Sequence, residues 1–532
     1  MEDSKSTAAP STADAVPVKG ETASQETTRK AGRGGLALAA GKIYFIFLGL
    51  IQQIVLQRVL GLDGYGGLST VLSLASITYN PIVSSSIQGV SRAVAQSPDA
   101  ERPQALRRTV GIHFLLSVPV ALAFFFAAPL VGESLRAPHL VSALRIVSFV
   151  ILFYGLYTPL VGALNGQQKF FHQAGLDAAA ATLRTCGLVG LGWWGATQFG
   201  RGVDGAATGF LLASATVCLL ACGIVGFGKP GEGGPSLKAH LGFIAPLVLG
   251  WIVFNLLLQA DFTMLRRLAA DAAIESGGLA KDADKLAGAY RATQLFCFLP
   301  FQMLLAATFI LFPMLAQAHR DRDREAVARY VRHGVRLAVI LAGLMVSVSS
   351  GLSASLLRLV FSDEIADLAG ESMQVLTLGY WLFAIFLVFT TVLNSLGRER
   401  ISMAITASAF GLVVVLCFVR VPGTPFGKEL LWQTATSTSL GIFFATSIGY
   451  LAVKRVAGSV VSWLSVGRVV LAMTVSISLG RWLPYEGKLF TLVHCAIVSI
   501  CYCALLIGSR EIGRNELGML KTILAKTPTP AA

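Results

Sequence analysis

Residues 140–165 read LVSALRIVSFVILFYGLYTPLVGALN, an apolar run interrupted by one charge, Arg145. A helix needs about 20 apolar residues to cross the hydrocarbon core of a bilayer. Stretches of this kind, separated by short polar loops, recur about 14 times from Leu36 to residue 509. The sequence therefore predicts an all-α polytopic membrane protein with about 14 transmembrane helices.

The composition agrees with this fold class. Of the 532 residues, 54% are hydrophobic and only 14% are charged. The polar loops reach only roughly 20 residues, which leaves no room for a water-soluble domain. Placing a charged side chain inside a membrane costs free energy, and such side chains usually have a function. We therefore expect the functional residues among the few polar side chains of the spans.

The charge distribution predicts the orientation. The net charge is +14, but most of the 43 Lys and Arg fall into alternate loops, with a dense cluster between His319 and Arg336. Cytoplasmic loops carry such an excess, so we place both termini in the cytoplasm of a multi-pass inner-membrane protein, anchored without cleavage of a signal peptide. The same distribution argues against nucleic acid as a partner.

Two local similarities indicate an internal duplication. The fourth span ends in Leu164-Asn165-Gly166 and the tenth in Leu393-Asn394-Ser395, an offset of 229 residues. Gly64-Tyr65 and Ala289-Tyr290 are separated by 225 residues. An even number of spans lies between the equivalent positions, so the two halves share one orientation, with a site expected between them.

These boundaries predict six regions. They are a disordered cytoplasmic tail at 1–35, an N-terminal six-helix lobe at 36–227, a cytoplasmic linker at 228–239, a C-terminal six-helix lobe at 240–453, two extra transmembrane helices at 454–509, and a cytoplasmic tail at 510–532.

Several short motifs resemble those of a known family. The segment Gln57–Gly66 resembles the Arg-x-Leu-Gly-x-x-x-Tyr-Gly signature of polysaccharide flippases in the multidrug/oligosaccharidyl-lipid/polysaccharide exporter superfamily. Gly288-Ala289-Tyr290, Leu299-Pro300, Phe312-Pro313 and the segment 393–398 also fit, and the resemblance covers roughly residues 36 to 510.

The resemblance implies two six-helix lobes around a central V-shaped cavity, with two C-terminal helices added. It also implies translocation of lipid-linked oligosaccharide by alternating access, with membrane lipids, a glycan polymerase and glycosyltransferases as partners. The lipid II flippase branch typically carries arginines and an acidic residue in its first helix. Phe45–Gln53 lacks them, which favours another polyprenyl-linked glycan.

The candidate substrate-binding residues lie in the N-terminal half. Arg184 is near the middle of the fifth span, and Asp177 lies two helical turns earlier on the same face. A guanidinium offers bidentate donors to a lipid diphosphate, although a structural Arg184–Asp177 pair would explain the same pattern. Further candidates are Lys42 and Arg92 at the span boundaries, and Gln52 and Gln53, which either bind sugar hydroxyls or join helices.

Asp261, Arg266 and Arg291 form a candidate outer gate, for which interfacial anchoring is the alternative. The motifs of soluble enzymes are absent: no phosphate loop, His-Glu-x-x-His site or nucleophile elbow is found. We therefore expect no catalytic residue, metal or cofactor. The rivals are a cation-coupled multidrug exporter of the same superfamily, a lipid II flippase, a membrane-embedded glycan ligase or polymerase, and a scaffold.

Overall fold

The computed structural model describes residues 19–231 and 233–511. Within this range the side chains at 19–40, 42, 306, 307, 309 and 310 lie outside the described residues. Secondary structure in the described part of the chain consists of helices without strands.

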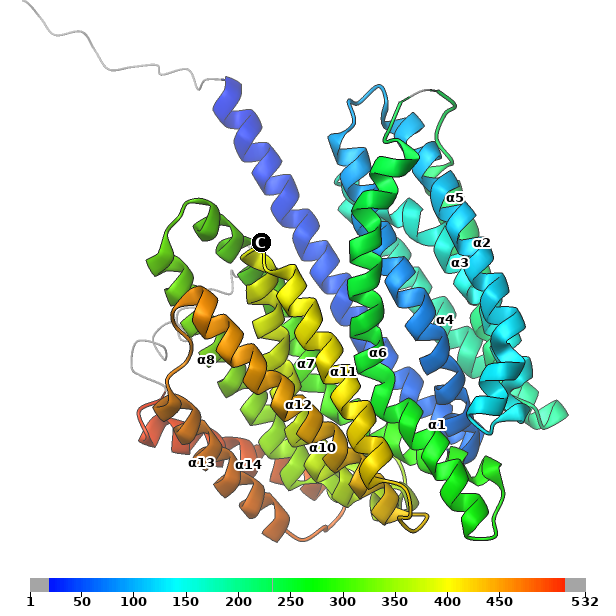
Figure 1. Ribbon diagram of the computed structural model, residues 1–532, viewed down its shortest axis with the longest axis vertical. Coiled ribbons are helices and arrows are strands. Elements are labelled where there is room, and N and C mark those ends of the chain that lie inside the picture. Colours follow the sequence, from blue (N-terminus) through cyan, green and yellow to red (C-terminus); the bar gives the residue numbers. More distant parts are fainter. Residues whose placement is uncertain (1–18, 232, 512–532) are drawn as a thin grey trace, which may run out of the picture.

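The first lobe consists of five consecutive helices, seen in blue to cyan in Figure 1. They are α1 (Lys19–Gln96), α2 (Arg102–Ser134), α3 (Val141–Gly166), α4 (Phe170–Phe199) and α5 (Gly202–Val225), with the short 3-10 helix η1 (Pro138–Leu140) before α3. We expected a polar loop between spans at 36–60 and 67–96. The chain instead remains helical on both sides of a kink at Gly61, whose φ of 70° suits glycine.

The expected disordered tail at 1–35 needs correction. Helix α1 begins at Lys19, so the backbone of residues 19–35 is helical, whereas residues 1–18 lie outside the described part. The apolar periodicity that we used cannot detect a polar helix of this kind, because it registers only helices with a buried face.

The remaining helices form the second half (Figure 1). They are α6 (Leu237–Glu275), η2 (Ala280–Asp282), α7 (Ala283–Arg320), α8 (Arg324–Gly351), α9 (Ser353–Val360), α10 (Asp363–Ser395), α11 (Glu399–Arg420), α12 (Lys428–Ala457), α13 (Trp463–Trp482) and α14 (Lys488–Gly508). Thus the expected linker at 228–239 already becomes helical at Leu237. The C-terminal tail from residue 512 lies outside the described residues.

Eleven segments of the described chain are helices long and apolar enough to cross a membrane. One of them, Ile43–Gln96, contains the two spans on either side of the Gly61 kink. Helices α4 and α7 are 30 and 38 residues long, and adding them gives the fourteen expected spans. Large apolar side chains such as Phe126 and Leu219 are more than 70% exposed, as expected for a surface that faces lipid.

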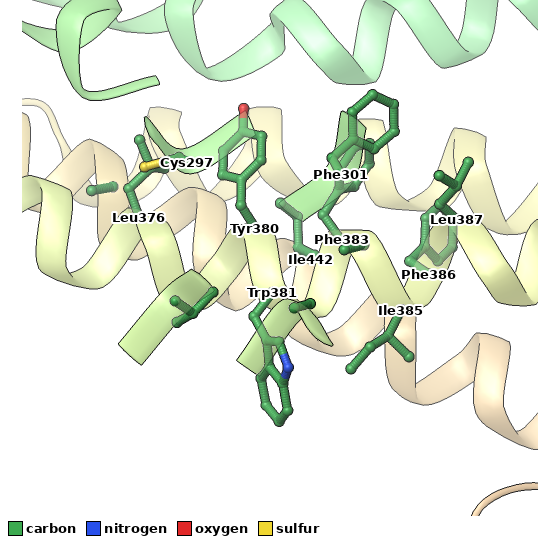
Figure 2. Close-up of a cluster of buried hydrophobic side chains, with 14 of the residues drawn as sticks. Cys297, Phe301, Leu376, Tyr380, Trp381, Phe383, Ile385, Phe386, Leu387 and Ile442 are labelled. Atoms are coloured by element: carbon green, nitrogen blue, oxygen red, sulfur yellow. The ribbon is translucent and has the colours of Figure 1, made fainter. Parts of the chain in front are cut away.

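Helix α10 is the centre of the second lobe. It packs against α7, α8 and α12, and most of its side chains are buried. Figure 2 shows aromatic rings from α10 and α7 packed together, including Phe301, Tyr380, Phe383 and Phe386. Aromatic pairs of this geometry contribute about 0.5–1.5 kcal/mol each beyond the area that they bury.

The predicted duplication is visible in the backbone. After α3, the amide of Lys169 donates to the carbonyl of Leu164 at 2.8 Å. After α10, the amide of Arg398 donates to the carbonyl of Leu393, also at 2.8 Å. Helix α3 packs against α2 and α5 as α10 packs against α8 and α12. The two halves therefore repeat both a helix end and a packing pattern.

Candidate functional site

Arg184 lies on α4 among aromatic residues from three other helices. Its guanidinium carbon is 5.7 Å from the centre of the Phe45 ring of α1 and 5.6 Å from the Phe210 ring of α5. The phenol of Tyr154 on α3 also faces this guanidinium. These distances are typical of cation–π contacts.

The aromatic cluster comprises Tyr79, Tyr154, Tyr157 and Phe210. Tyr79 and Tyr154 meet edge to face at 5.3 Å between ring centres, and Tyr154 meets Phe210 at 5.7 Å. Tyr79 and Tyr154 are only partly buried. Arg184 therefore lies above a partly accessible surface of rings and hydroxyl groups.

The structural Arg184–Asp177 pair, which was the alternative explanation, is not formed. Among the described side chains, no carboxylate lies within ion-pairing distance of Arg184, and Asp177 lies close to Tyr157 instead. Asp177 also has another interaction partner, so its carboxylate is not free. The two residues occupy one helix face, as the sequence indicated, but only Arg184 remains without a counter-ion in the described part.

The other candidates of the first lobe lie at helix contacts. Gln52 is buried, and its Oε1 accepts a hydrogen bond from Thr185 of α4 at 3.2 Å, so it joins helices. Its Nε2 has no partner within the described structure. Gln53 is partly buried on α1. The side chain of Lys42 lies outside the described residues.

Arg92 is exposed near the end of α1. Its guanidinium carbon lies 4.2 Å from the centre of the Phe243 ring on α6, and its Nε donates to Gln96. The structure therefore places Arg92 at the contact between the first lobe and α6, apart from the aromatic cluster around Arg184.

The candidate gate residues separate into two groups. Arg266 donates through Nε to Asp284 at 2.7 Å and is 0% exposed. His139 of the first lobe reaches the other oxygen of Asp284 at 2.6 Å. Near them, a Cβ added to Gly66 would lie 1.8 Å from the carbonyl oxygen of Asp284. We call these four residues, Gly66, His139, Arg266 and Asp284, the seal.

Asp261 and Arg291 belong to a separate buried network. Asp261 accepts hydrogen bonds from Tyr290 at 3.0 Å and from Gln294 at 3.1 Å. Arg291 donates to Gln294 at 2.9 Å and also to Ser73 of α1. Arg291 therefore connects the lobes, whereas Asp261 is enclosed within the second half.

Sequence reasoning missed Asp284 as the partner of Arg266 and His139 as the second partner of Asp284. His139 precedes α3, whereas Asp284 opens α7, and they are 145 positions apart. The motifs that contain Gly66 and Tyr290 lie next to the seal in the structure. Their spacing in the sequence, however, did not indicate which charged side chains form ion pairs there.

The chain matches two family models. The model described as "Polysaccharide biosynthesis protein" matches residues 31–319, more than half of the chain, and the model described as "MatE" matches residues 276–419. A curated relative, "Probable multidrug resistance protein NorM" of Rhizobium meliloti (strain 1021), is 30% identical over 172 residues. That alignment spans 32% of this chain and 37% of the relative's length.

Solved structures share the fold. "Lipid II flippase MurJ, inward closed conformation" superposes with a TM-score of 0.72 at 13% identity, over 90% of this chain and 100% of that one. A multidrug resistance MATE family transporter of the MOP superfamily in an inward-facing conformation gives 0.60 at 16% identity, over 78% and 94%. The chain thus belongs to the Polysaccharide biosynthesis protein family and has the fold of transporters of the multidrug/oligosaccharidyl-lipid/polysaccharide exporter (MOP) superfamily.

Proposed function

We propose that this transporter is a flippase for polyprenyl-diphosphate-linked oligosaccharide, which it moves across the inner membrane by alternating access for assembly of a surface polysaccharide. The observation that carries the proposal is Arg184, a partly buried cation without a carboxylate partner among the described side chains. A diphosphate would supply the missing charge through bidentate hydrogen bonds. Tyrosine hydroxyls nearby both donate and accept hydrogen bonds, as sugar hydroxyls require.

The orientation follows from the positive-inside rule. Both termini lie in the cytoplasm, so the seal lies on the periplasmic side, where it joins the two lobes. The substrate would then be received from the cytoplasmic leaflet, where glycosyltransferases complete it, and delivered to a periplasmic glycan polymerase. The seal opens in the other half of the cycle.

The buried carboxylate argues against a multidrug exporter. An exporter of cationic drugs needs an acidic group that faces its substrate, but Asp261 is 2% exposed and already accepts three side-chain or backbone donors. The uncompensated charge near the accessible rings is positive, which favours an anionic substrate.

The proposal is tested by surface glycan in cells that carry Arg184→Ala, normalised to protein level. A hydrogen bond to a charged group contributes about 1.5–3 kcal/mol, so we expect export to fall about 10- to 100-fold. Arg184→Lys should recover only part of it, because an ammonium lacks the planar pair of donors.

Arg145→Ala is the matched control. Arg145 is an exposed arginine of α3 that lies over Phe125, away from Arg184, and its removal changes the net charge equally. Full export by Arg184→Ala would overturn the proposal. Recovery of export in the Asp177→Ala/Arg184→Ala double variant would do the same, since it would make Arg184 structural.

A further inference from the structure

Two buried histidines join the first lobe to α6. The Nε2 atoms of His113 on α2 and His240 on α6 are 3.2 Å apart. The Nδ1 atom of His113 lies 2.9 Å from the hydroxyl of Ser86 on α1. The two histidines are only 2% and 3% exposed, so the pair is a polar contact enclosed among three helices.

The geometry limits how many protons the pair can hold. Two Nε2 atoms at this distance need one proton between them, with one ring donating and the other accepting. Ser86 suits either tautomer of His113, because a hydroxyl both donates and accepts. One added proton leaves this hydrogen bond in place between a charged and a neutral ring, whereas a second added proton would point two N–H groups at each other and break the contact.

No described carboxylate lies within ion-pairing distance of either ring. Within two helical turns of Ser86, His113 and His240, the charged side chains are Arg92 of α1, Arg107 and Arg108 of α2, and Lys238 of α6, and Tyr157 of α3 packs at the same end. None is an anion at neutral pH, so an added proton would be a buried charge without compensation, which is strongly unfavourable. Protonation therefore favours a state in which the rings separate and reach water.

Helix α6 contains a proline close to this point. Its first part packs on α1, where a Cβ on Gly89 would lie 2.6 Å from Ile244 and 3.4 Å from His240. Its later part packs on α7, α11 and α12 of the second lobe. Pro246 lies between these parts and removes a backbone hydrogen bond, which permits a bend.

We propose that the His113–His240 pair is a proton-binding site, and that uptake of a proton from water releases the first part of α6 from α2 during the transport cycle. The inference rests on the proposed transport function and adds a coupling ion to it. By linkage, the separated state binds more protons, so falling pH shifts the population towards it.

The test uses the purified full chain in lipid nanodiscs, with the eight native cysteines replaced. Spin labels are attached at Arg108→Cys of α2 and Ala239→Cys of α6, both exposed. Their distance is measured by electron paramagnetic resonance between pH 8 and pH 5. We expect the ratio of separated to joined molecules to rise by up to about tenfold per pH unit, the limit for one linked proton.

The His113→Gln/His240→Gln variant should lose this pH response, because amide side chains do not titrate in this range. His494→Gln, which changes a histidine of α14 that is 8% exposed, should retain it. A wild-type distance that stays constant from pH 8 to pH 5 would overturn the proposal, as would an unchanged response in the double variant. If Arg184→Ala exports normally while the distance still titrates, the proposed substrate fails and the proton site stands.

Discussion

Gly66 of α1 and Gly288 of α7 bring the two lobes into backbone contact. A Cβ added to Gly66 would lie 1.8 Å from the Asp284 carbonyl oxygen and 2.6 Å from the Gly288 amide. Overpacking of this kind costs about 1–3 kcal/mol, and the cost falls only on the sealed state. We therefore expect Gly66→Ala to shift the population towards an open seal by about 5- to 150-fold.

The measurement is the labelling rate of Thr70→Cys by a membrane-impermeant thiol reagent in intact cells. Thr70 is 2% exposed, so its replacement should react slowly in the parent and faster in Gly66→Ala. Gly111→Ala serves as the control, because nothing lies within 4 Å of its added Cβ. Equal labelling in the two glycine variants would contradict a steric role for Gly66.

At the scale of elements, Glu511, which follows α14, connects α13 and α14 to α8 of the second lobe. Its carboxylate accepts from Arg336 of α8 at 2.8 Å and from Arg468 of α13 at 3.3 Å, and it also accepts from Ser465. Burial alone would raise the pKa of Glu511, but the hydrogen bonds from Ser465 and Arg336 hold that pKa below its usual value.

A lowered pKa in the folded state means that the stabilisation is present above the unfolded value of about 4.3 and is lost as pH falls through the folded value. We expect Glu511→Gln to cost about 1–3 kcal/mol at pH 7 and to flatten the fall of the melting temperature below about pH 4.3. Thermal unfolding of the purified protein across pH measures both effects. Glu486→Gln, at an exposed position between α13 and α14, should leave the curve unchanged.

At the scale of the whole molecule, the charge pattern predicts which ends of the helices face the periplasm. Ser276 is exposed at the end of α6 near the seal, and Asp321 is exposed between α7 and α8 at the opposite end. In a background without native cysteines, an impermeant maleimide should label Ser276→Cys in intact cells. Asp321→Cys should react only after the membrane is permeabilised, and the reverse pattern would invert the orientation.

Hydropathy predicted most helices closely, as shown by the tenth span, which was expected to end in Leu393-Asn394-Ser395 and is observed as α10, Asp363–Ser395. It missed the kink at Gly61 and the break at Leu352 between α8 and α9. The hydropathy averaged over a span carries no information on the backbone dihedral angles of single residues. It identified Arg184 as a mid-span charge but not its neighbours Phe45 and Phe210, which come from other helices. Such contacts depend on how the helices pack, and no fixed spacing along the sequence predicts them.

The burial of the Arg266–Asp284 pair has a consequence for the protein's surroundings. Dissolved ions screen exposed charges over a length of about 8 Å at 0.15 M salt, whereas charges enclosed by protein are much less affected. The Arg136–Asp271 and Lys285–Glu364 pairs are 30% to 55% exposed, but Arg266 is inaccessible. In the orientation that we propose, the strength of the contact that closes the periplasmic side would therefore change little with the salt concentration outside the cell.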